Sequence, residues 1–254
     1  MSWNPGQYLK FGGERLRPAH DLLARVPLEA PRTIADLGCG TGTVTALIRT
    51  RWPQARITGI DNSPQMLERA RATLPDVVWE AADLSQWTPA GPIDLIVSNA
   101  ALHWLDDHGA LFPRLISRLA KGGVLAVQMP AQHTEPSHLV GYDLAESARY
   151  RDALKGMVRR RPVLDAVAYY DIIRPRVRSL DLWSVEYVQM LTGDNPVAEF
   201  TKGSFVGVWL SALASDDARD FEAEYRARIA AAYPKRQDGV TLFPFRRFFI
   251  VACR

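Results

Sequence analysis

The chain has 254 residues, of which 47% are hydrophobic and 23% charged, enough to bury a full core and typical of one α/β domain with an elaboration. Its 31 basic and 28 acidic residues leave a formal charge of +3, too slight an excess to predict a nucleic-acid partner. The sequence has no run of about 18 apolar residues and no signal-like first segment, so we expect a cytoplasmic protein without membrane association. Cys39 and Cys253 form no paired metal or redox spacing, which favours a reducing compartment.

Short apolar runs alternate with helical patterns between residues 33 and 129, which predicts successive β-α units and a largely parallel sheet. An amphipathic helix is predicted upstream over 14–26, after an aromatic-rich arm that contains Trp3, Tyr8 and Phe11. The predicted strands are 33–37, 56–60, 77–81, 93–98 and 124–128. The predicted helices are 43–52, 64–74 and 110–120, with Ser63 as cap of the second and Gly122 and Gly123 as stop of the third.

The regular alternation stops after residue 130. We interpret residues 131–180, which include Arg159, Arg160 and Arg161, as an insertion over the sheet. A strand at 185–191, helices at 196–213 and 216–233 and a last strand at 247–252 follow. The prediction is an α/β fold with a mostly parallel seven-stranded sheet and a helical cap. Its parts are an arm and helix (1–30), a cofactor-binding core (31–130), a substrate cap with one core strand (131–215) and a final helix and strand (216–254).

A glycine-rich segment, Asp36-Leu37-Gly38-Cys39-Gly40-Thr41-Gly42, ends the first predicted strand and opens a helix. Open α/β sheets bind ligands at this place, outside the carboxyl ends of their strands. The dinucleotide pattern G-x-G-x-x-G would require glycine or alanine at Thr43, whereas this chain has G-x-G-x-G. Asp36 would repel a pyrophosphate and suits a ligand that ends in a cationic amino acid.

This segment resembles motif I of the class I S-adenosylmethionine-dependent methyltransferases, which have a Rossmann-like core. The resemblance implies S-adenosylmethionine as cofactor and S-adenosylhomocysteine as product. It implies that Asp61 accepts both ribose hydroxyls, that Asp83 binds the adenine amino group, and that the loop after the fourth strand lies beside the methyl group. The cofactor-binding residues that it implies are Asp36, Gly38, Gly40, Gly42, Asp61, Asn62, Asp83, Leu84 and Asn99.

The termini resemble the trans-aconitate 2-methyltransferase family more specifically. The similar segments are Trp3 to Phe11, Glu14 to Val26, Gly123 to Pro130, Ile229 to Pro234 and Phe245 to Ala252. This resemblance implies O-methylation of a small organic acid, with His103, Trp104, Lys202 and Arg246 as substrate-binding candidates and the arm as a lid over the cofactor. Two positions depart from the family pattern: Gly207 replaces an arginine suited to carboxylates, and His103 replaces a frequent glutamine.

Direct methyl transfer to a carboxylate needs no general base, since a carboxyl group with a pKa near ~4 is ionised at neutral pH. If the acceptor is a hydroxyl, His103 is the candidate catalytic base. His20, His108, His133 and His138 have no metal-ligand spacing, so no metal is predicted. The open alternatives are a methyltransferase for a different acid or hydroxyl and a non-catalytic cofactor-binding protein. We expect a monomer or weak homo-oligomer.

Overall fold

The computed structural model describes residues 12–160 and 163–254. The predicted arm with Trp3, Tyr8 and Phe11 and the side chain of Arg161 therefore lie outside the described residues. The chain divides into two compact units. The core unit holds residues 15–130, 163–185 and 247–254, and the second unit holds residues 12–14, 131–160 and 186–246.

A seven-stranded sheet runs through the described chain in the order β3-β2-β1-β4-β5-β7-β6. Strands β3, β2, β1, β4 and β5 pair in parallel, and β7 pairs antiparallel with β5. The sequence prediction of a mostly parallel seven-stranded α/β fold is confirmed. The strands are Thr33–Leu37 (β1), Arg56–Asp61 (β2), Val78–Ala81 (β3), Ile93–Asn99 (β4), Leu119–Pro130 (β5), Ser179–Leu191 (β6) and Thr241–Cys253 (β7).

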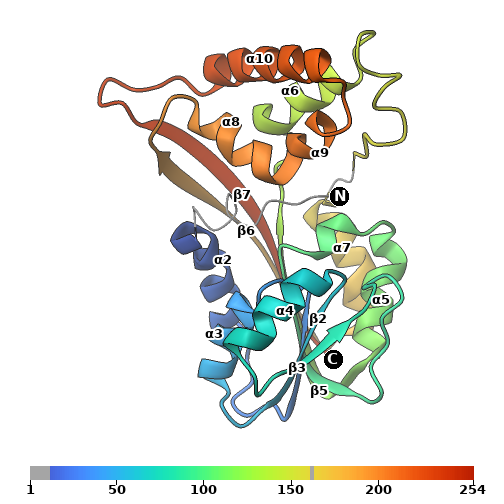
Figure 1. Ribbon diagram of the computed structural model, residues 1–254. Coiled ribbons are helices and arrows are strands. Elements are labelled where there is room, and N and C mark those ends of the chain that lie inside the picture. The colour runs from blue at the N-terminus through green and yellow to red at the C-terminus, as the bar shows by residue number, and fades with distance from the viewer. Residues whose placement is uncertain (1–11, 161–162) are drawn as a thin grey trace. The chain divides into compact units, whose positions relative to one another are not determined.

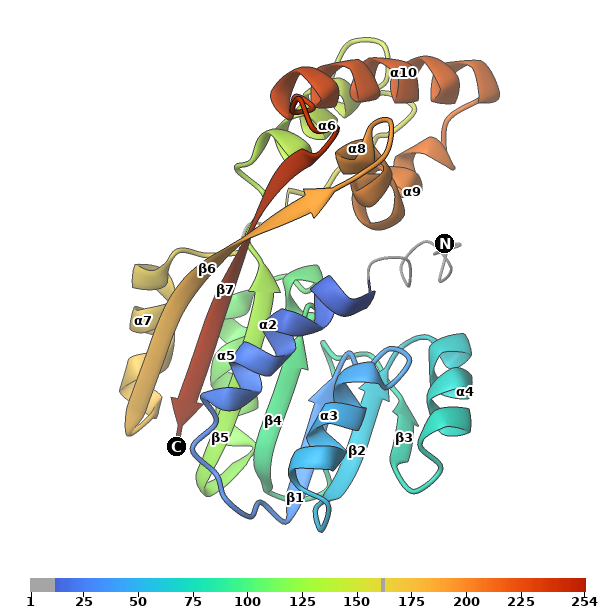
Figure 2. The ribbon, with the colours of Figure 1, turned by 90° about the vertical axis from the view of Figure 1, so that its left-hand side faces the viewer.

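Helices cover both faces of the sheet in the core unit. Figure 2 shows α2 and α3 in front of the sheet and α5 behind it. The start of α4 follows from its sequence, because Pro64 occupies the first turn and the Ser63 side chain accepts a hydrogen bond from the Met66 amide. The helices of this unit are Gly12–Ala24 (α2, which begins in the second unit), Thr43–Arg51 (α3), Pro64–Thr73 (α4), Leu102–Trp104 (η1), His108–Ser117 (α5), Ala166–Ile173 (α7) and Arg174–Arg176 (η2).

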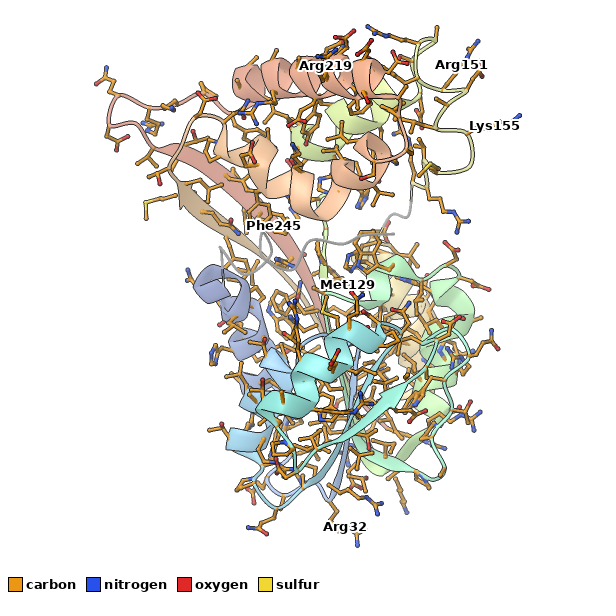
Figure 3. The ribbon with its side chains drawn as sticks, viewed as in Figure 1. Arg32, Met129, Arg151, Lys155, Arg219 and Phe245 are labelled. Atoms are coloured by element: carbon orange, nitrogen blue, oxygen red, sulfur yellow. The ribbon has the colours of Figure 1, made fainter. Side chains whose placement is uncertain are left out.

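The second unit has an aromatic core of its own. Tyr150, Phe221, Tyr225 and Phe243 are each at most 1% exposed, and Phe245, labelled in Figure 3, belongs to the same cluster. Its helices are Pro136–Ala145 (α6), Pro196–Thr201 (α8), Lys202–Val206 (η3, a π-helical turn), Gly207–Leu210 (α9) and Ser215–Ala232 (α10). Figure 1 labels α6, α8, α9 and α10.

Several predicted boundaries are wrong. Gly122 and Gly123 do not stop a helix: α5 ends at Ser117, and both glycines lie inside β5. Gly123 packs so closely against β4 that an added Cβ would lie 2.9 Å from the Ile93 carbonyl oxygen. Strands β6 and β7 begin six residues earlier than predicted. The stretch 131–180 is also not one insertion, because α7 lies in the core unit, where it packs on α5.

Candidate functional site

The parallel strands bring most of the predicted cofactor residues to one edge of the sheet, at the carboxyl ends of β1, β2, β3 and β4. The loop between β1 and α3 is tied there to the end of β2. The amides of Gly38 and Cys39 donate to the Ile60 carbonyl at 2.8 and 3.1 Å. Asp61 Oδ2 accepts the Gly40 amide, and its Oδ1 accepts the Ser63 amide, each at 2.9 Å. A carboxylate has about four acceptor positions, so Asp61 keeps capacity for further donors such as hydroxyl groups.

The three glycines of the loop serve different purposes. A Cβ on Gly38 would lie 2.1 Å from Ala101 Cβ, and one on Gly42 would lie 2.8 Å from the Trp79 ring. Both positions are therefore filled by the protein's own residues. Gly40, with φ of 56°, has no heavy atom within 4 Å of its Cβ position. Only Gly40 leaves its surroundings open to a ligand that approaches the backbone.

Asp36 is buried at the end of β1, with 1% of its surface exposed. Its Oδ2 accepts a hydrogen bond of 2.6 Å from Thr45 Oγ1 on α3. Burial, together with the charge of Asp61, raises the pKa of Asp36 to about 6, against the opposing effect of the Thr45 hydrogen bond. The carboxylate form is therefore costly to keep without a cationic partner, which suits the predicted contact with an ammonium group.

Asp83 and Leu84 follow β3 on an ordered turn. The Ser85 amide donates to Asp83 Oδ1 at 2.8 Å, and this bond is the main reason that the pKa of Asp83 is lowered. Arg114 holds the same turn by donating to the Leu84 carbonyl at 2.9 Å. The Asp83 side chain stays exposed and ionised, and Asn62 after β2 is likewise exposed.

The chain turns sharply at the end of β4. Ala100 has φ of 55°, a left-handed conformation that costs a residue with a Cβ about 1–3 kcal/mol. The turn puts Ala101 against Gly38 and starts η1, where the His103 ring lies 4.7 Å from that of Trp104, itself 54% exposed. Asn99 Oδ1, just before the turn, is buried and has no hydrogen-bond partner among the described residues. Such an atom, next to a strained residue, fits a site that receives a polar ligand.

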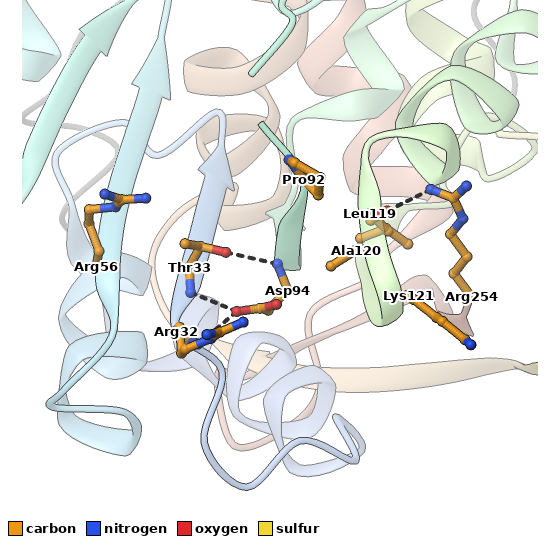
Figure 4. A pocket seen from close by; sticks show the side chains of 9 residues that line it. All are labelled: Arg32, Thr33, Arg56, Pro92, Asp94, Leu119, Ala120, Lys121 and Arg254. Atoms are coloured by element: carbon orange, nitrogen blue, oxygen red, sulfur yellow. Dashed lines mark hydrogen bonds between the residues drawn. The ribbon is translucent and has the colours of Figure 1, made fainter. Parts of the chain in front are cut away.

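A cavity of about 980 Å³ lies at the opposite edge of the sheet, where the parallel strands begin (Figure 4). Its single acidic side chain, Asp94, accepts the backbone amides of Arg32 and Thr33 at 2.8 and 3.0 Å. Arg254 is also engaged, since it donates to the Leu119 carbonyl at 2.6 Å. This cavity is separate from the residues predicted to bind the cofactor.

Comparison with known proteins identifies the type of chain. Residues 34–123 match the family described as a methyltransferase domain. Over 253 residues, the chain is 47% identical to a trans-aconitate 2-methyltransferase from Azoarcus, with 100% of this chain and 99% of that protein covered. It is 43% identical to the protein of that name from Escherichia coli, covering 99% and 98%.

The chain belongs to the trans-aconitate 2-methyltransferase family. The predicted class, an S-adenosylmethionine-dependent methyltransferase, is thereby confirmed. The solved structure of the YcgJ protein from Bacillus subtilis has a TM-score of 0.59 at 14% identity, covering 93% of this chain and 97% of that one, and it shows the shared fold.

The cationic substrate candidates of this family member lie in the second unit. Lys202 Nζ forms an ion pair of 2.6 Å with Glu222 Oε1, and both side chains are about one third exposed. Arg246 is about half exposed and lies 3.9 Å from Glu135. Arg160 is bound by both oxygens of Glu146, and Arg159 is exposed. Their roles in binding an acid stay predictions.

The departure from the family pattern at Gly207 has a local cause. Gly207 follows the π-helical turn η3, and a Cβ on it would lie 2.4 Å from the Lys202 carbonyl oxygen. An arginine at this position therefore requires a different backbone path, since the β-carbon itself collides with the turn.

Sequence reasoning missed two residues at the sheet edge. Trp79 on β3 covers Gly42 and also Gly59, whose Cβ position lies 2.3 Å from the ring. Gln128 on β5 is fully buried, and its amide nitrogen and oxygen have no partner among the described residues. The glycine opposite Trp79 was a usable signal for the first, but no sequence pattern separates Gln128 from a core position.

Over the described ranges, no group of three or more His, Cys, Asp or Glu residues could hold a metal ion. Nor is any helix in these ranges long and apolar enough to span a bilayer.

Proposed function

We propose that this protein transfers a methyl group from S-adenosylmethionine to a carboxylate of trans-aconitate or a closely similar small acid. The observation that carries the proposal is the relatedness to trans-aconitate 2-methyltransferases over the full length of the chain. The match extends through residues of the second unit, well beyond the 34–123 segment that matches the methyltransferase-domain family.

The donor would be held by the residues of the sheet edge. Asp61, already oriented by two backbone amides, accepts the ribose hydroxyls, and Asp83 accepts the adenine amino group. Asp36 and the unpartnered Asn99 Oδ1 take the ammonium end, while Gly40 admits the ligand to the backbone. When bound, S-adenosylmethionine would supply a sulfonium methyl group whose carbon a carboxylate oxygen can attack directly, with S-adenosylhomocysteine as the leaving group.

The chain's own contribution to the chemistry is positioning. An ionised carboxylate is already the nucleophile at neutral pH, so no side chain has to remove a proton. Rate enhancement then comes from holding the reacting oxygen in line with the methyl group. Trp104 and His103, directly after the strained turn at Ala100, are candidates for this task. Lys202 and Arg246 are candidates for binding the acid.

The proposal includes the setting of the enzyme. We infer a cytoplasmic protein, monomeric or weakly self-associating, that uses a small-molecule acceptor and no nucleic acid. Support comes from the near-balanced charge and from the two cysteines, which are free and buried in the described structure.

A product screen tests the proposal. The purified protein is incubated with S-adenosylmethionine and a panel of di- and tricarboxylates that includes trans-aconitate, cis-aconitate and citrate, and methyl esters are read by mass spectrometry. We expect a monomethyl ester of trans-aconitate together with S-adenosylhomocysteine.

Production of S-adenosylhomocysteine only with hydroxyl acceptors would favour the second candidate, hydroxyl methylation with His103 as base. Binding of the cofactor without any methylated product would indicate a non-catalytic cofactor-binding protein.

A further inference from the structure

Gln128 is a buried amide with nothing to bind. It lies near the carboxyl end of β5 and is 0% exposed. Neither Nε2 nor Oε1 has a hydrogen-bond partner among the described residues. A buried polar group without a partner costs stability, and an amide carries two donors and one acceptor group. A leucine or methionine at this position would fill the same space without that cost, so the amide calls for a ligand-based explanation.

The strand register places Gln128 beside a second unpartnered amide. Gln128 pairs with Asn99 on β4 and with Phe249 on β7. Directly paired residues of neighbouring strands present their side chains on the same face of a sheet. Asn99 Oδ1 is the other buried, unpartnered oxygen at this edge, and Phe249 is stacked on Trp183 at 4.7 Å. Gln128 therefore lies between a polar strand end and an aromatic surface.

The order of the strands tells which ligand Gln128 faces. The glycine loop and Asp61 belong to β1 and β2, and the sheet continues from β1 through β4 to β5. Neighbouring strands are about 4.8 Å apart, so β5 is displaced about 10 Å from β1, on the side away from β2. With the ribose at Asp61 and the ammonium end at Asp36 and Asn99, as proposed above, the sulfonium group between them would lie along the sheet edge from β2 to β4. Gln128, one strand further, lies on the acceptor side.

We propose that Gln128 binds the methyl acceptor, with its amide nitrogen donating a hydrogen bond to the carboxylate that is methylated. This inference rests on the proposed function. An uncharged donor suits that carboxylate because its negative charge is lost as the ester forms. A cation in the same place would stabilise the ionised reactant more than the transition state and would slow the reaction. Cationic side chains are better used on the carboxylates of the acid that keep their charge.

The test compares Gln128→Leu with a matched control. Gln189→Leu removes another buried glutamine with an unpartnered amide oxygen, on β6 in the second unit. In the absence of ligand, we expect both variants to unfold at the same temperature as the parent or a few degrees higher, since each loses an unsatisfied polar group. Gln128→Glu, with nearly the same shape, adds a charge that repels the acid.

Binding and kinetics separate the variants. For Gln128→Leu we expect the S-adenosylhomocysteine Kd to stay within about threefold and the KM for trans-aconitate to rise at least about tenfold. Gln128→Glu should lose more, and Gln189→Leu should match the parent. As a measurement without turnover, trans-aconitate should raise the unfolding temperature of the S-adenosylhomocysteine complex in the parent and in Gln189→Leu but not in Gln128→Leu.

Gln128→Asn withdraws the amide by one methylene group, so its KM for trans-aconitate should lie between those of the parent and Gln128→Leu. This variant replaces Gln128→Leu in the test if the leucine variant does not fold. An unchanged KM and unchanged acid-induced stabilisation in Gln128→Leu would overturn the assignment and leave the proposed function standing. A loss of S-adenosylhomocysteine affinity in that variant would overturn it in favour of a cofactor contact. If the parent itself neither binds nor methylates any acid, the proposed function fails, and this assignment fails with it.

Discussion

Asp36 is the residue whose replacement has the most direct consequence. Its carboxyl group is buried, and its pKa is raised from 3.8 to about 6, first by burial and then by the charge of Asp61. Asp36→Asn keeps the size of the side chain and an oxygen that can accept the Thr45 hydroxyl, but it removes the ionisation. The variant should therefore be more stable than the parent at neutral pH in the absence of ligand.

The magnitude follows from linkage. Between pH 3.8 and about 6 the folded state holds a proton on Asp36 that the unfolded state has released, so the free energy of unfolding falls as pH rises. Each unit of pKa difference corresponds to about 1.4 kcal/mol, which gives a cost of about 3 kcal/mol that is fully present above pH 6. Asp36→Asn should remove this cost at neutral pH and show no such gain near pH 3.8.

Urea unfolding at several pH values between about 4 and 8 measures the difference, since all other titrating groups are common to the two proteins. Thr45→Val provides a second point: loss of a hydrogen bond that lowers the pKa of Asp36 should extend the fall in stability to higher pH in this variant than in the parent. Calorimetry with S-adenosylhomocysteine should show weaker binding to Asp36→Asn, which has no charge to offer an ammonium group. A variant that is less stable than the parent at about pH 8, by an amount independent of pH, would refute the reasoning.

Three further predictions concern the donor, the possible base and the acid. Asp61→Ala should lower affinity for S-adenosylhomocysteine far more than Asp83→Ala, since it removes two charge-assisted hydrogen bonds of about 1.5–3 kcal/mol each against one; equal losses by calorimetry would contradict the roles. His103→Gln should keep kcat for trans-aconitate within about tenfold, a barrier change below about 1.4 kcal/mol; a hundredfold loss, with a parent rate that rises through a pKa near that of histidine, would indicate a base-dependent hydroxyl acceptor. Lys202→Ala should raise the KM for the acid with little change in kcat. Glu222→Gln, which frees the lysine from its ion pair, should leave that KM unchanged or lower it. An unchanged KM in Lys202→Ala would show that the lysine forms the ion pair and does not bind the acid.

The central strands and the glycine loop were predictable because each is a short apolar run that ends at an unusual polar or glycine cluster. β1 matches its prediction, and β2 and β4 differ only by one residue at their ends. The start of β5 was not predictable in the same way. Gly122 and Gly123 read locally as a helix stop, and only pairing with β4 and β7 keeps this segment in the sheet.

The candidate site was predictable where a single residue type at a fixed position in a motif provides the binding group, as with the carboxylates of Asp36 and Asp61. What could not be predicted depends on neighbours distant in sequence. Gln128 stands in an apolar run, and only its three-dimensional surroundings reveal that its amide is unsatisfied. The ion pair that engages Lys202 comes from Glu222 on another helix, a pairing that no local pattern encodes.

The contact between Gly38 and Ala101 limits how this enzyme can be redesigned. Ala101 Cβ occupies the space where a side chain on Gly38 would begin, so the donor loop and the segment after β4 are fitted to each other at this point. Transplanting the 100–104 segment from a relative, a natural way to alter acceptor preference, succeeds only if the graft keeps alanine or glycine at 101. A bulkier residue at 101 would push the glycine loop between β1 and α3 away from β2. A graft intended to change the methyl acceptor would then first reduce cofactor binding.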